Sequence, residues 1–184
     1  MLRDRLVKMG ACKEAVAWVG NRDITAAWAE CERADWMLWL ADRVMARKPV
    51  VLAACACART ALQYVPAGED RPRVAIETTE AWARGEVTIA EVRTADAAAY
   101  AAAYAAYAAY AAAGSALAAY AAAAAAYAAV AAYVDAAYAA YAAADAAADA
   151  DATARKVALA QMADLVRGII AADQVTAGLE ASND

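Results

Sequence analysis

The chain has 184 residues, a length typical of one domain and sufficient to bury a hydrophobic core without metals or disulfides. Its net charge is −5, from 17 basic and 22 acidic side chains, which argues against general binding to nucleic acids. Histidine is absent, and this excludes hydrolases that use a serine–histidine or cysteine–histidine pair. We therefore expect a protein that acts by binding, is not an enzyme, and has neither a cofactor nor a metal site.

Apolar residues recur at helical spacing along almost the whole chain, and no segment alternates with period two, so the sequence predicts an all-α fold. We expect a single-domain helical bundle over residues 1–184, with its core in residues 1–93. Caps at Asp23 and Asp35, a stop at Gly20 and a capping box at Thr88 and Glu91 set several helix ends. The predicted helices in this part cover residues 12–19, 24–33, 36–45, 49–64, 70–82 and a segment from 88 onward.

The predicted helix over residues 49–64 is apolar almost all round at residues 50–58, so we expect it at the centre of the core. The N-terminal residues have mixed charge and no apolar segment of signal-peptide length, which predicts a cytoplasmic location. The cysteines fit neither zinc knuckles nor a disulfide framework. We interpret all four as reduced, small core residues: Cys12, Cys31, Cys55 and Cys57.

Residues 95–150 contain 38 alanines and nine tyrosines, and they are predicted to form a helical hairpin over residues 94–150. The tyrosines continue the apolar face of the preceding helix, and Gly114-Ser115 supplies the break between the two arms. We expect the tyrosine faces of the arms to meet, within one chain or between two chains of a homodimer. Because Asp145 and Asp149 fall on the tyrosine face, either that face leaves the core or the arm ends near Ala144, and we expect the break.

A final helix is predicted over residues 151–172, with one apolar side that docks on the core. Residues 173–184 have weak patterning and are expected to fray. The apolar side of the final helix comprises Leu159, Met162, Leu165, Val166, Ile169 and Ile170.

Two stretches, CKEAVAWVG at residues 12–20 and AWAECERADWMLWL at residues 27–40, resemble the bacterial immunity-protein-five-like family of immunity proteins. The similarity continues through residues 47–59, 64–66, 68–72 and 75–85, whereas the second half is similar only in composition. The resemblance implies an all-α protein from a polymorphic toxin system that binds and silences a toxin. It implies no catalytic residues.

Trp36 and Trp39 lie one helical turn apart in the densest aromatic cluster, a spacing suited to anchoring a partner. Packing of all five tryptophans in one core is the alternative. Acidic residues near this cluster and in residues 135–151 would attract a basic protein such as a nuclease toxin, or would only keep an apolar chain soluble. The candidate partner-binding residues are Glu32, Asp35, Trp36, Trp39, Asp42, Asp135, Asp145, Asp149 and Asp151.

The uncharged run over residues 97–134 exceeds the roughly 20 residues that span a bilayer. Its few strongly apolar side chains and its lack of flanking basic residues argue against a membrane span. The leading hypothesis is an immunity protein that neutralises a protein toxin by non-covalent occlusion. The alternative is a phage or mobile-element anti-defence protein that sequesters a small molecule or blocks a host defence enzyme, and a tyrosine-lined pocket would favour it over a convex acidic face.

Overall fold

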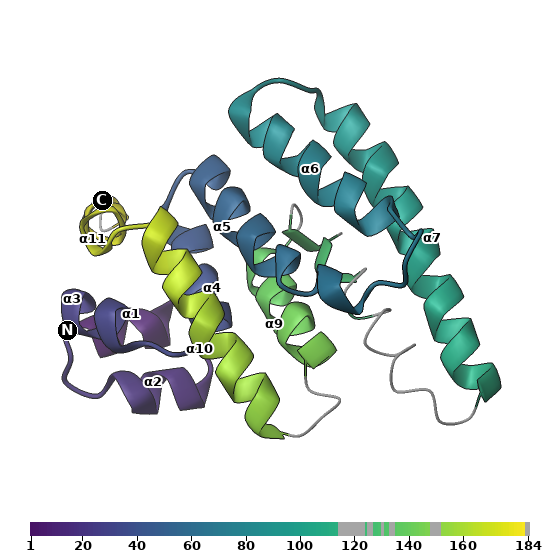
Figure 1. Ribbon diagram of the computed structural model, residues 1–184. Coiled ribbons are helices and arrows are strands. Elements are labelled where there is room, and N and C mark those ends of the chain that lie inside the picture. The colour runs from purple at the N-terminus through teal and green to yellow at the C-terminus, as the bar shows by residue number, and fades with distance from the viewer. Residues whose placement is uncertain (114–123, 125–126, 130, 133–134, 148–151, 183–184) are drawn as a thin grey trace.

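The computed structural model describes residues 1–113, 124, 127–129, 131–132, 135–147 and 152–182, and Figure 1 shows their arrangement. All regular elements in these residues are helices, which confirms the predicted all-α fold. The elements are α1 (Leu2–Lys8), α2 (Lys13–Val19), α3 (Ile24–Glu30), α4 (Ala34–Val44), α5 (Arg47–Arg59), the 3-10 helix η1 (Leu62–Tyr64), α6 (Arg71–Arg84), α7 (Ile89–Ala113), α9 (Ala136–Ala147), α10 (Ala152–Ile169) and α11 (Ala172–Ala181).

Several helices begin and end where their capping residues predict. The Asp23 carboxylate accepts a hydrogen bond from the Ala26 amide at 2.8 Å, which starts α3. Thr88 and Glu91 form a capping box at the start of α7, with the Thr88 amide donating to Glu91 Oε2 at 2.8 Å. Gly85 ends α6 with a φ of 85°, a left-handed conformation that favours glycine.

Several predicted boundaries in the first half are wrong by a few residues. Helix α3 ends at Glu30 and not at Arg33, and α4 begins at Ala34 with Asp35 inside its first turn. Asp35 does not cap α4, because the Arg33 guanidinium holds its carboxylate. Helix α5 ends at Arg59, where the Thr60 hydroxyl donates to the Cys57 carbonyl at 2.7 Å, and η1 follows.

Helix α5 lies at the centre of the core, as predicted. Val50, Val51 and Cys57 are among its buried side chains, and the helix packs against α6, α9 and α10. Helices α6 and α7 pack side by side as a pair, and α9 contacts α4, α5 and α10 (Figure 1). The first half and the end of the chain therefore share one core.

The alanine-rich helices bury their alanine faces, so the expected burial of the tyrosine faces is wrong where the structure describes them. Tyr100 and Tyr104 on α7 are 41% and 63% exposed, and Tyr138 and Tyr141 on α9 are also exposed. Alanine faces let helix axes approach closely, and the tyrosine hydroxyls then remain near water. The buried alanines include Ala99, Ala102 and Ala103 on α7 and Ala139, Ala140 and Ala143 on α9.

Among the described residues, the two arms of the predicted hairpin touch where Tyr127 packs on the alanine face of α7. Its ring meets the Tyr100 ring edge-on, with 5.4 Å between the ring centroids. The expected turn at Gly114-Ser115 lies outside the described residues. Helix α9 continues to Ala147 and does not end at Ala144, because its tyrosine face points outward and Asp145 therefore stays out of the core.

Helix α11 replaces the expected frayed tail. Val175 and Leu179 are buried, and the Gln174 side chain accepts a hydrogen bond from the Ala171 amide at 2.9 Å at the start of the helix. Arg5 of α1 donates to the Leu179 carbonyl, so the two ends of the chain are joined. Two apolar residues are too few to predict a helix from the sequence. Helix α11 is stabilised by its contacts with α3 and α4.

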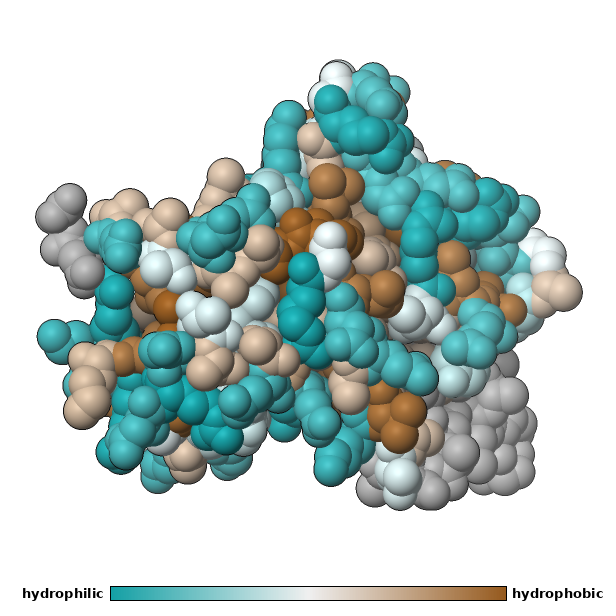
Figure 2. Space-filling model, turned by 60° about the vertical axis from the view of Figure 1, so that its left-hand side comes forward, coloured by the Kyte–Doolittle hydropathy of each residue, from teal (hydrophilic) through white to brown (hydrophobic). Residues whose placement is uncertain are grey.

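Helix α10 docks on the core as predicted, although its apolar side is narrower than expected. Met162 and Val166 are fully buried, whereas Leu165 and Ile169 are 40% and 38% exposed. On the face in Figure 2, hydrophilic side chains alternate with small hydrophobic clusters.

Candidate functional site

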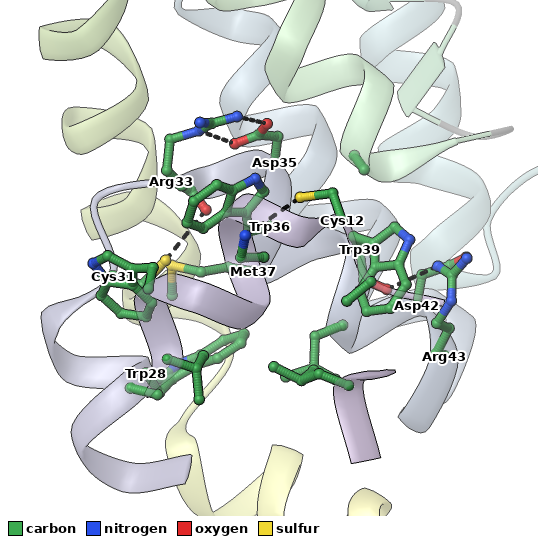
Figure 3. Close-up of a pocket in the computed structure, with 18 of the residues that line it drawn as sticks. Cys12, Trp28, Cys31, Arg33, Asp35, Trp36, Met37, Trp39, Asp42 and Arg43 are labelled. Atoms are coloured by element: carbon green, nitrogen blue, oxygen red, sulfur yellow. Dashed lines mark hydrogen bonds and ion pairs between the residues drawn. The ribbon is translucent and has the colours of Figure 1, made fainter. Parts of the chain in front are cut away.

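A pocket of about 740 Å³ opens among α1, α2, α3, α4 and the first turns of α9 (Figure 3). Its most buried lining side chains are mainly apolar, and five aromatic side chains of the lining are partly exposed. The buried group includes Leu6, Val19, Trp28 and Leu40, and the aromatic group comprises Trp18, Trp36, Trp39, Tyr138 and Tyr141. Four of the five tryptophans therefore line one pocket, while Trp82 lies on α6 and does not line it.

Helical spacing places the aromatic side chains of the pocket. Trp36 and Trp39 are three residues apart on α4, so they lie on one face of that helix. Trp18 of α2 packs against Trp36, with 6.2 Å between the ring centroids. Tyr138 and Tyr141 have the same spacing on α9, and their rings stack at 6.2 Å with an interplanar angle of 15°.

An arginine guanidinium packs over the ring of each half-exposed tryptophan in the pocket. The guanidinium carbons of Arg22, Arg33 and Arg43 lie 4.8, 4.3 and 3.8 Å from the ring centroids of Trp18, Trp36 and Trp39, respectively. Arg43 also donates to the Trp39 carbonyl at 3.1 Å. These cation–π contacts restrain the rings, so contacts within the chain help to hold the pocket walls in place.

Arg33 and Asp35 form a tight ion pair beside Trp36 (Figure 3). Arg33 Nε and Nη2 donate to Asp35 Oδ1 and Oδ2 at 2.9 and 2.6 Å, and the Asp35 carboxylate raises the pKa of Arg33 through these hydrogen bonds. Asp35 is only 9% exposed. The two charges cancel within the wall, so this pair orients Trp36 and adds no net charge to the pocket.

Two further carboxylates at the pocket have no such partner. Asp42 and Asp135 are exposed, and neither forms an ion pair within the described part of the chain. Asp135 Oδ1 accepts a hydrogen bond from the Tyr138 amide at 3.0 Å, so it also caps α9. Apart from the Arg33 pair, the charged lining groups are thus one arginine, Arg43, and two carboxylates.

The structure brings together five of the nine candidate binding residues: Asp35, Trp36, Trp39, Asp42 and Asp135 all line the pocket. Glu32 is exposed in the connection between α3 and α4 and does not line it. Asp145 lies elsewhere on α9 and pairs with Arg155 at 2.8 Å, so the second acidic stretch is neutralised at that position. Asp149 and Asp151 lie outside the described residues.

The sequence interpretation missed several lining residues. Arg33 and Arg43 carry no recognisable binding motif, although the i,i+4 spacing of Trp39 and Arg43 on α4 is a usable signal. Cys12 is wrongly interpreted as a core residue, since it is exposed, lines the pocket and caps α2 through its sulfur. The other cysteines are buried, as expected, and burial raises the pKa of Cys31, Cys55 and Cys57.

Comparisons with family models, curated proteins and solved structures gave no match for this chain. Within the described residues, no group of three or more cysteine or acidic side chains is placed to hold a metal ion. None of the helices in the described ranges is both long and apolar enough to cross a bilayer.

Proposed function

We propose that this chain neutralises a protein toxin by covering part of its surface, and that the aromatic pocket is its docking site. One observation carries the proposal: the lining combines tryptophan, tyrosine and arginine, the residues that contribute most to binding at protein interfaces. Trp36 and Trp39 are half-exposed and already restrained by Arg33 and Arg43. Restrained rings lose little conformational entropy when a partner binds, which favours affinity. The sequence resemblance to immunity proteins supports the same role.

A second candidate function is the sequestration of a small molecule, as in an anti-defence protein of a phage or mobile element. The volume of about 740 Å³ falls within the roughly 300–1,000 Å³ of small-molecule sites. Tyr138 and Tyr141 line the same pocket. Mass spectrometry of the denatured, freshly purified protein would detect such a ligand.

Co-expression with candidate toxins of bacterial polymorphic toxin systems tests the docking function. We expect the chain to rescue growth and to co-purify with one of these toxins, and the variant Trp36→Ala/Trp39→Ala to lose both properties. Tyr104→Ala is the matched control, because Tyr104 is an exposed aromatic side chain on α7, away from the pocket. Thermal unfolding by circular dichroism checks that the variants fold. Full rescue by the double tryptophan variant would refute the assignment of the docking site.

A further inference from the structure

The charges around the pocket indicate the chemistry of the partner segment that binds there. We infer that the pocket binds a basic amphipathic segment, in which a bulky apolar side chain enters the cavity and neighbouring lysine or arginine side chains pair with Asp42 and Asp135. This inference rests on the proposed docking function and specifies the chemistry of the docked segment.

The apolar half of the inference follows from the buried lining. Leu6, Trp28 and Leu40 are 5%, 4% and 7% exposed, and the apolar atoms beside them face an open volume of about 740 Å³. That space accepts several side chains of a partner segment. An apolar side chain that enters removes water from these surfaces, which is favourable in proportion to the area buried.

The basic half follows from the balance of charge. The ion pair of Arg33 and Asp35 is closed within the wall, and the Arg43 guanidinium already lies over the Trp39 ring. Arg43, Asp42 and Asp135 are all exposed, so one positive and two negative charges leave the pocket with a net charge of −1 for a partner. Oδ1 of Asp135 is used at the cap of α9, whereas Oδ2 makes no hydrogen bond to the described residues. An acidic segment would meet two like charges here, and a basic one would gain charge-assisted hydrogen bonds.

The aromatic walls suit the stem of a lysine or arginine. Three tryptophans of the pocket already hold guanidinium groups of this chain within 4.8 Å of their ring centroids, so the partner's stem packs on the rest of the apolar lining. Long basic side chains also pack their methylene groups on apolar surface while the charged end stays near water.

Three synthetic helical peptides of equal length test the inference on the full chain. The first peptide has leucine on one helical face and lysine on the other. The second replaces every lysine by glutamate, and the third keeps the lysines and replaces every leucine by serine. Binding is measured by tryptophan fluorescence and by protection of Cys12, which lines the pocket, from a thiol reagent. We expect only the leucine–lysine peptide to bind, with an affinity that falls as salt is added.

The carboxylates are tested by the variant Asp42→Asn/Asp135→Asn. Asparagine caps helices as well as aspartate, so α9 keeps its start. We expect roughly threefold to tenfold weaker binding of the leucine–lysine peptide and a flatter salt dependence. Glu77→Gln/Glu86→Gln changes the net charge equally at exposed positions that do not line the pocket, and we expect it to bind like wild type.

Three results would overturn the inference: equal binding of the leucine–glutamate peptide, no Cys12 protection by any peptide, or equal behaviour of the two charge variants. Binding of the glutamate peptide would refute the charge of the segment but leave the docking site intact. Toxin capture that survives Trp36→Ala/Trp39→Ala would instead refute the docking site itself.

Discussion

We expect the free energy of unfolding of this protein to fall as the pH rises, because of the buried carboxyl group of Asp96. The residue lies on α7, is only 9% exposed, and its Oδ1 has no hydrogen-bond partner among the described residues. Thr79 of the neighbouring α6 is also buried with an unpartnered hydroxyl. Burial raises the pKa of Asp96 from 3.8 to about 7, because the charged form loses water and gains no counter-ion. We expect Asp96→Asn to remove this pH dependence.

The sign follows from proton linkage. The unfolded chain releases the Asp96 proton near pH 3.8, whereas the native chain holds it until about pH 7. The stabilisation is therefore fully present below pH 3.8 and is lost as the pH rises through about 7. A rise of roughly three pH units in pKa corresponds to at most about 4 kcal/mol. Entry of water beside α7 would relieve part of this cost, so we expect about 1–3 kcal/mol.

Urea unfolding followed by circular dichroism at about pH 5 and about pH 8 measures the effect. Asp96→Asn should exceed the wild-type free energy of unfolding by a larger margin at the higher pH than at the lower one, and the two margins should differ by about 1–3 kcal/mol. Asp42→Asn is the matched control, because Asp42 is exposed and should leave the pH dependence unchanged. The same pH dependence in wild type and Asp96→Asn would refute the reasoning.

Three further predictions concern packing and thiol access. A Cβ at Gly178 would lie 2.9 Å from the Val44 carbonyl carbon, so Gly178→Ala should cost about 1–3 kcal/mol. A Cβ at Gly168 in α10 meets no atom within 4 Å, so Gly168→Ala should raise the free energy of unfolding by about 0.5–1 kcal/mol. Equal melting temperatures of the two variants would contradict the close contact of α11 with α4. Trp28→Phe removes the indole N–H that donates to the Ile170 carbonyl at 3.0 Å, so it should lower the free energy of unfolding by about 1–3 kcal/mol. Chemical denaturation measures this change, and an unchanged free energy of unfolding would contradict the prediction. A thiol reagent should modify Cys12 rapidly and the three buried cysteines only on unfolding, and a second fast thiol in the native protein would count against their burial.

The candidate site was only partly predictable from the sequence. The i,i+3 spacing of Trp36 and Trp39 marked one wall, because both residues belong to a single helix. The other walls come from α1, α2, α3 and α9, and no local pattern relates Tyr138 to Trp39. Charge prediction failed for Asp145, whose neutralising Arg155 lies ten residues further along the chain on another helix.

Local physical chemistry was enough for most of the helices, although it did not predict α1 or α11. Apolar periodicity identified the all-α fold, and side chains such as Asp23, Thr88 and Glu91 marked helix starts because they bond to backbone amides within three residues. Asp135 and Gly85 act on the same short range. Such interactions join residues that are only a few positions apart in the chain, so the sequence by itself determined them.

Tertiary structure alone decided which faces are buried and which segments meet. Both faces of the alanine-rich helices are apolar, and contact with α5 and α6 selects the alanine face for burial. Helix α11 is ordered because Gly178 and Leu179 reach α4 and Arg5, and Trp28 is fixed by a carbonyl 142 residues away. The pocket depends on contacts of this kind. Their energies arise between residues distant in the chain, so no local pattern encodes them.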